Sequence, residues 1–186
     1  MRLRFAHKLS FTKILVSATV LFVVAASALL IAYVRRTDIH GAIRSGDVRG
    51  LKAMLARSPD LVQERGDMGA TPLHTAAEQG HAEIINLLIE RGMPPGQSDW
   101  IARTPLHLAA AKGHAEATAA LLEKGANHRA KNNQNDTPLH LAADAGHVDV
   151  ARILIEAGAD INAKDYRNQT PLKRAQDRGR KKVVEL

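Results

Sequence analysis

The sequence has 186 residues, which is enough for one folded domain or one repeat array and too few for a large multidomain enzyme. It contains no cysteine, so disulfides, thiolate zinc sites and cysteine nucleophiles are excluded. The sequence holds 26 Lys and Arg against 19 Asp and Glu, and this excess of positive charge lies mainly at the N-terminus. Residues 38–172 hold 14 basic and 17 acidic side chains. Because the folded part carries no basic stripe, we do not expect it to bind nucleic acid.

The first element in chain order is an apolar run over residues 14–34, with no charged side chain in 21 positions. As a helix it would span about 30 Å, the thickness of the hydrocarbon layer of a bilayer. We therefore predict a single-pass signal anchor here, with residues 1–13 as a basic cytoplasmic flank and residues 35–37 as a linker. Four basic residues before the run favour a cytoplasmic N-terminus. The remaining chain would then lie on the periplasmic or extracellular side. We expect the membrane to be a bacterial inner membrane.

A cleaved signal peptide is the alternative interpretation of this run. The segment AASA at residues 25–28 offers the small side chains of a cleavage site. Cleavage there would leave an apolar mature N-terminus, and the run continues well past that point. Its length therefore favours the uncleaved anchor.

The remaining sequence repeats every 33 residues. TPLHTAAEQGH begins at Thr71, TPLHLAAAKGH at Thr104 and TPLHLAADAGH at Thr137, and a degraded copy, TPLKRAQDRGR, begins at Thr170. Thr before Pro is typical of a helix N-cap followed by the first helical residue, and the Gly that follows each copy is typical of a left-handed C-cap. A second helix with larger apolar residues follows each copy, so one unit alone leaves an apolar face that only a neighbouring unit can cover.

These motifs resemble the ankyrin repeat family over residues 38–186. The resemblance implies an all-α solenoid of stacked helix pairs with short β-turn tips, here preceded by the single transmembrane helix. We expect four repeats, the first lacking Thr-Pro and longer by one residue, and a truncated C-terminal cap. The resemblance also implies a monomeric, non-enzymatic module that binds another protein.

Six of the nine histidines recur at the 33-residue period, so they would lie on successive layers about 10 Å apart, too far to share one metal ion. We interpret them as structural groups that bridge helix ends and loops through hydrogen bonds. His40 and His128 stand apart from this pattern and are expected at the surface. No catalytic motif, metal site or cofactor site is predicted.

The binding residues are expected on the concave surface, at the tips before each Thr-Pro and on the first helices. Carried over position by position, the partner-binding residues are Met68, Trp100, Ile101, Arg103, Gln134, Tyr166, Arg167, Glu78, Gln79, Lys112 and Asp144. The leading contacts are expected to be Trp100, Ile101, Arg103 and Tyr166. Trp100 stands out among them because Trp is enriched in binding hot spots. Alternatively its ring folds onto the neighbouring tip or onto the membrane interface.

Three hypotheses for function remain open at this point. The first is a membrane-anchored protein that captures a partner protein through the concave face. The second is a signal-cleaved periplasmic or secreted accessory protein that stabilises an enzyme. The third, an enzyme, has no visible catalytic residues to support it.

Overall fold

The computed structural model describes residues 38–186. The predicted anchor at residues 14–34, its flank and its linker lie outside the described residues. Within residues 38–186 no helix is long and apolar enough to cross a bilayer. The membrane assignment therefore stays a prediction from the sequence.

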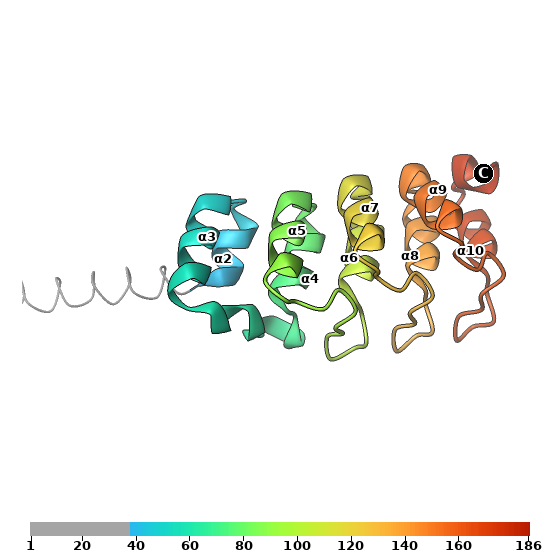
Figure 1. Ribbon diagram of the computed structural model, residues 1–186. Coiled ribbons are helices and arrows are strands. Elements are labelled where there is room, and N and C mark those ends of the chain that lie inside the picture. The colour runs from blue at the N-terminus through green and yellow to red at the C-terminus, as the bar shows by residue number, and fades with distance from the viewer. Residues whose placement is uncertain (1–37) are drawn as a thin grey trace, which may run out of the picture. The chain divides into compact units, whose positions relative to one another are not determined.

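The described chain forms five antiparallel helix pairs (Figure 1). The pairs are α2 (Ile39–Arg44) with α3 (Val48–Arg57), α4 (Pro72–Gln79) with α5 (Ala82–Glu90), α6 (Pro105–Lys112) with α7 (Ala115–Glu123), α8 (Pro138–Ala145) with α9 (Val148–Glu156), and α10 (Pro171–Asp177) with α11 (Lys181–Val184). Two 3₁₀ turns, η1 (Pro59–Gln63) and η2 (Asp67–Gly69), follow the first pair. No strand occurs in residues 38–186, which confirms the all-α expectation for this part of the chain.

The first helices begin as the sequence predicts. Thr71, Thr104 and Thr137 are extended N-cap residues, and each forms a capping box with the histidine three positions later. Each of these helices ends at a glycine in the left-handed conformation. Gly113 must be glycine for two reasons. Its φ is +80°, and an added Cβ would lie 2.5 Å from the His147 ring.

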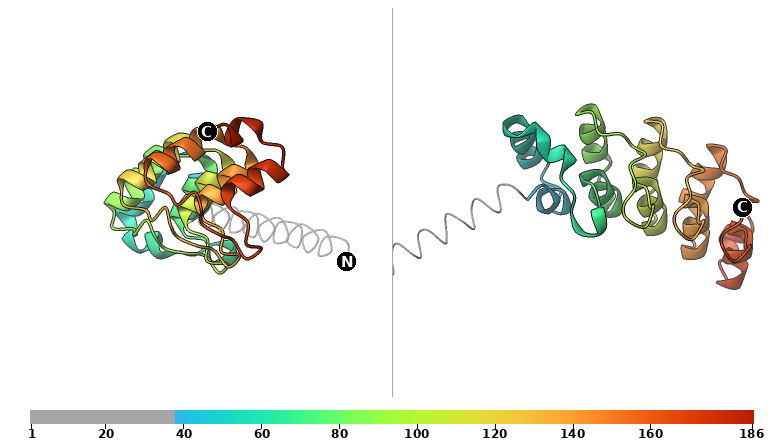
Figure 2. Two further views of the ribbon diagram at one scale, coloured as in Figure 1. Left: turned by 90° about the vertical axis from the view of Figure 1, so that its right-hand side faces the viewer. Right: turned by 90° about the horizontal axis from the view of Figure 1, so that it is seen from below.

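The core alternates small and large side chains. The paired alanines of α4, α6 and α8 are at most 1% exposed, so neighbouring first helices approach closely. The second helices supply the larger fully buried residues Ile84, Ile85, Leu88, Leu121 and Leu154. The left view of Figure 2 looks along the stack and shows the helix pairs lying one behind another.

The first repeat contains one residue more than the others, and this accounts for a wrong prediction. His40 was expected at the surface, yet it is only 7% exposed and its Nδ1 lies 2.7 Å from Thr75 Oγ1. It precedes His74 by 34 residues, so it is the first repeat's version of the same histidine, displaced from the period by the insertion. His128 is half-buried rather than exposed.

The loop GMPPGQ after α5 follows the path of the other repeats despite its two prolines. Met93 is 2% exposed, and its N–H donates to the carbonyl of Leu88 at 3.1 Å. Ala126 and Ala159 make the equivalent bonds one and two repeats later, at 2.9 and 3.0 Å. The buried methionine therefore takes the place of the usual alanine.

The fifth pair is short, as predicted. Leu172 is 48% exposed, whereas Leu73, Leu106 and Leu139 at the same repeat position are at most 2% exposed. Each of those three is covered by the following helix pair, and residues 38–186 contain no pair after α11 to cover Leu172.

Candidate functional site

The repeated histidines connect neighbouring repeats. The Nδ1 of His74 accepts a hydrogen bond from the Thr71 N–H at 3.2 Å, and its Nε2 donates to the carbonyl of Arg103 in the next repeat at 2.8 Å. His107 and His140 repeat this bridge to the next tip, at 3.0 and 3.1 Å. The structural interpretation of these imidazoles is confirmed.

A second histidine series points the other way along the stack. His114 and His147 donate from Nε2 to first-helix carbonyls of the preceding repeat at 2.9 and 3.1 Å. Arg180 makes the same bridge with its Nε to the carbonyl of Asp144 at 3.0 Å. His81 is the exception, since its buried Nε2 has no partner within residues 38–186. It lies against Gly46, in the turn between α2 and α3 of the longer first repeat.

Burial keeps the bridging imidazoles neutral. Desolvation lowers the pKa of His107 to about 4, and it lowers the pKa values of His74 and His140 as well. A neutral ring with the proton on Nε2 matches the observed pattern, in which Nδ1 accepts and Nε2 donates. In the described part of the chain no three His, Asp or Glu side chains converge as the ligands of a metal would.

The turn tips share one construction. In the tips of residues 99–103, 132–136 and 165–169, the first residue is Asp or Asn, and its Oδ1 accepts two backbone N–H bonds from its own turn at 2.8–3.0 Å. Burial alone would raise the pKa of the Asp99 carboxyl, but hydrogen bonds from the Arg103 backbone and guanidinium hold it below its usual value.

Backbone bonds also tie each tip to the next. The N–H of Trp100 donates to the carbonyl of Met68 at 3.0 Å, and Tyr166 donates in the same way to Gln134. The N–H of Asn133 donates to the carbonyl of Ile101 at 3.1 Å. The tips therefore form one continuous row that holds their side chains in fixed positions.

Trp100 lies against the neighbouring tip and is still largely exposed. Its indole rests on the preceding tip, because a Cβ added to Gly69 would fall 2.4 Å from the indole Nε1. The side chain nevertheless stays 72% exposed, and the nearby Met68 and Ile101 are 49% and 38% exposed. A supported but solvent-exposed apolar cluster, the Trp100 cluster of Met68, Trp100 and Ile101, therefore lies on the tips.

Ala102 occupies the tip position where the family prefers glycine. Its φ is +61°, close to the values of Asn135 and Asn168 at the same position in the next two tips. The turn therefore keeps its form, and the alanine carries a backbone strain of about 1 kcal/mol.

The other predicted partner-binding residues lie in two places, at ion pairs on the surface and in one pocket. Lys112 and Glu78 pair across α6 and α4 at 3.4 Å, and Gln79 is exposed beside them. Arg103 is half-buried and pairs through its Nε with Asp99 at 2.8 Å. The remaining four line one pocket together: Gln134, Asp144, Tyr166 and Arg167.

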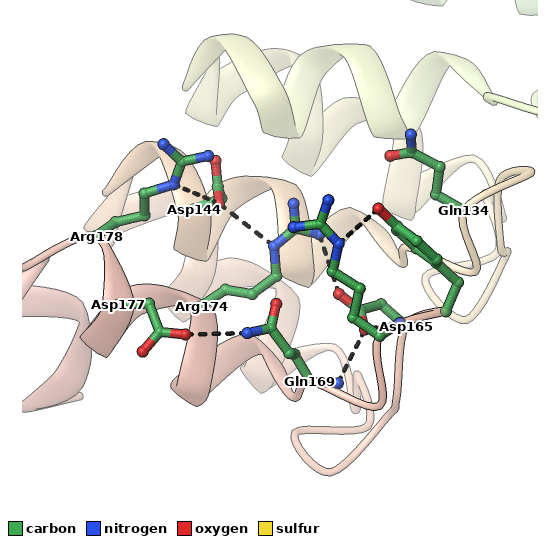
Figure 3. Close-up of a pocket in the computed structure, with 9 residues that line it drawn as sticks. Gln134, Asp144, Asp165, Gln169, Arg174, Asp177 and Arg178 are labelled. Atoms are coloured by element: carbon green, nitrogen blue, oxygen red, sulfur yellow. Dashed lines mark hydrogen bonds and ion pairs between the residues drawn. The ribbon is translucent and has the colours of Figure 1, made fainter.

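This pocket lies between the last two tips and α10 and has a volume of about 430 Å³ (Figure 3). Its centre is occupied by Arg174, which pairs with Asp136, with Asp144 at 3.3 Å and with Asp165 at 3.6 Å. Asp136 and Asp165 are 2% and 1% exposed, so Arg174 neutralises two buried carboxylates from different repeats. Arg178 adds a second bond to Asp144 at 3.1 Å.

Sequence analysis missed Arg174 and Arg178 as members of the concave surface. A signal was present, because Arg174 stands where Leu108 and Leu141 stand in the two preceding full repeats. A charged residue at a repeat position that is Thr75 or leucine in the preceding full repeats indicates a new set of partners. Arg178 carries no comparable signal, since charged residues are ordinary at helix ends.

Comparison with known proteins agrees with this architecture. A model of the family described as "Ankyrin repeats (3 copies)" matches residues 23–99, 39–132, 94–165 and 128–186. The human "NAD-capped RNA hydrolase NUDT12" is 39% identical over 56 residues, which is 30% of this chain and 12% of that protein. "Alpha-latrotoxin-Lt1a" of Latrodectus tredecimguttatus is 43% identical over 60 residues, or 31% of this chain and 4% of the toxin.

A rice relative, "Probable E3 ubiquitin-protein ligase XBOS32" of Oryza sativa subsp. japonica, is 43% identical over 53 residues, or 28% of this chain and 11% of the ligase. The chain thus spans a small fraction of the length of these curated relatives. Proteins of such different activities share a repeat that in general serves as a non-enzymatic scaffold for binding other proteins. The repeated capping boxes, the histidine bridges and the family match together show that this chain belongs to the ankyrin repeat family.

Proposed function

We propose that this chain is a non-enzymatic, membrane-anchored protein that captures one partner protein through its concave face and turn tips. The anchor is residues 14–34, the N-terminus is cytoplasmic, and the repeat domain works on the periplasmic or extracellular side, with a bacterial inner membrane as the favoured setting. The repeat domain acts as a monomer. The anchor and its orientation rest on the apolar run and its flanking charges.

The Trp100 cluster is the observation that carries the proposal. Trp100 is 72% exposed together with the exposed Met68 and Ile101, and the neighbouring tip supports its ring. Exposed apolar side chains that are grouped in this way often mark a binding site. A supported ring has already lost most of its conformational freedom, so its burial by a partner costs little entropy. Burying such an anchor contributes about 2–4 kcal/mol to binding.

Affinity capture from solubilised membranes tests the proposal. Trp100→Ala and Ile101→Ala should each reduce the recovery of the partner, while the midpoint of thermal unfolding stays within a few degrees of the parent. Ile161→Ala is the matched control, because Ile161 is also exposed, at 53%, but lies in the loop after α9. Full recovery of the partner by the Trp100 variant would contradict the proposal.

A signal-cleaved accessory protein is the second candidate, since the small residues at 25–28 provide a cleavage site. In that case the chain would be released and would stabilise an enzyme by binding it. Sequencing the N-terminus of the mature protein separates the two: an intact residue 1 supports the anchor, and a new N-terminus after residue 28 supports release.

A further inference from the structure

We infer that the pocket at the C-terminal end of the concave face receives an acidic side chain of the captured protein. The inference rests on the proposed function, because it names the chemistry of the segment that the concave face holds. The pocket is open to solvent, has a volume of about 430 Å³ and is lined by groups from α8, α10 and two turn tips (Figure 3). This volume suits one or two side chains of an extended segment.

The carboxylates in this pocket already have their donors. Asp165 accepts two backbone N–H bonds of its own turn, at 2.8 and 2.9 Å, and is 1% exposed. Asp144 accepts from the Nε groups of Arg174 and Arg178. Asp177 accepts from the ammonium of Lys173 at 2.6 Å. A cationic ligand would therefore have to compete with the hydrogen bonds that these carboxylates already accept.

The guanidinium groups at the rim are only partly used. Arg178 bonds through Nε alone, and its side chain is 61% exposed. Arg167 bonds through Nε to the hydroxyl of Tyr166 at 2.6 Å. The terminal amino groups of both arginines make no hydrogen bond or ion pair within residues 38–186. Paired N–H donors of this kind match a carboxylate, which accepts two parallel bonds from one guanidinium.

The charge of the last repeat favours the same ligand. Residues 173–186 hold six Lys and Arg against two Asp and Glu, whereas residues 38–172 hold 14 against 17. The C-terminal end of the array is therefore its positive end, whereas the rest of the array is slightly acidic. Such a field steers an acidic segment to this end and disfavours a basic one.

The distance to the Trp100 cluster sets a spacing in the bound segment. Tyr166, at the edge of the pocket, lies two tips beyond Trp100, and with layers about 10 Å apart the two sites are about 20 Å apart. An extended chain advances about 3.3 Å per residue, so roughly six residues span this distance. The captured segment accordingly carries an apolar side chain and an acidic side chain about six positions apart.

The test uses the full chain in a non-ionic detergent and fluorescein-labelled synthetic peptides of twelve residues. One peptide places Leu and Glu six positions apart in a Ser, Thr and Asn background, and its partner replaces Glu with Gln. Fluorescence anisotropy at low salt should show the Glu peptide binding about tenfold more tightly, the loss expected when one charge-assisted contact is removed.

Arg178→Gln should abolish this preference for Glu, and Arg167→Gln should reduce it, while thermal unfolding stays unchanged because both side chains are exposed. Arg152→Gln, an exposed arginine on α9, is the matched control and should keep the preference. Equal affinity for the two peptides, absence of Glu-peptide binding, or a preference that survives Arg178→Gln would overturn the inference. Trp100→Ala should weaken both peptides equally, so the proposed function and the acidic-site inference fail separately.

Discussion

We predict that acid destabilises the repeat array between pH 6.5 and 4, before most carboxylates titrate. The reason is that His74, His107 and His140 are buried as neutral rings, with pKa values below the 6.5 of the unfolded chain. In this window the unfolded state binds more protons than the folded state, so the free energy of unfolding falls as the pH falls. The stabilisation is fully present above pH 6.5.

The size of the loss in unfolding free energy can be worked out from His107. Its pKa is about 4 in the folded chain, its side chain is 0% exposed, and both ring nitrogens are hydrogen-bonded. Moving from pH 7.5 to pH 4.5 should then cost about 2.5 kcal/mol of unfolding free energy from this residue alone. His74 and His140 add to the loss in the same direction.

Urea unfolding followed by far-ultraviolet circular dichroism measures this loss, with the full chain in a non-ionic detergent at both pH values. The His107→Gln variant should be less stable at pH 7.5, because the carbonyl of Asp136 loses its donor. Its further loss on going to pH 4.5 should be smaller than that of the parent by about 2.5 kcal/mol. An equal loss in parent and variant would refute a neutral, buried His107.

Three further substitutions probe the backbone and the central ion cluster. Ala102→Gly should raise the free energy of unfolding by about 1 kcal/mol, measured by urea unfolding, because the φ of +61° suits glycine. Gly113→Ala should lower the thermal midpoint more than Gly125→Ala, since both have positive φ but only Gly113 faces a neighbour, the His147 ring at 2.5 Å; equal midpoints would contradict the close approach. Arg174→Ala should cost about 3–5 kcal/mol in urea unfolding, because it leaves two buried carboxylates without their cation; a loss under about 1 kcal/mol would show that the cluster contributes like a surface pair.

The helix pairs, their ends and their buried faces follow from local signals in the sequence. Each repeat carries its own Thr-Pro start, its own glycine stop and an apolar face that only a neighbour can cover, so the repeat period predicts the stack. The histidine bridges follow from the same regularity, because equivalent contacts recur between successive layers from the second repeat onward. The first repeat shows the limit of this reasoning: one inserted residue displaced His40 from the period and led to the wrong prediction.

The candidate site depends on contacts that no repeat unit specifies by itself. Arg174 meets Asp136, which lies 38 residues earlier, and Arg178 meets Asp144, which lies 34 residues earlier. Whether such side chains meet is decided by the rotation of one layer on the next and by the direction of each side chain, and both come from packing. The sequence by itself therefore determined the array and led to the proposed binding face, whereas only the tertiary structure decided which charges are satisfied within that face and which guanidinium groups still face solvent.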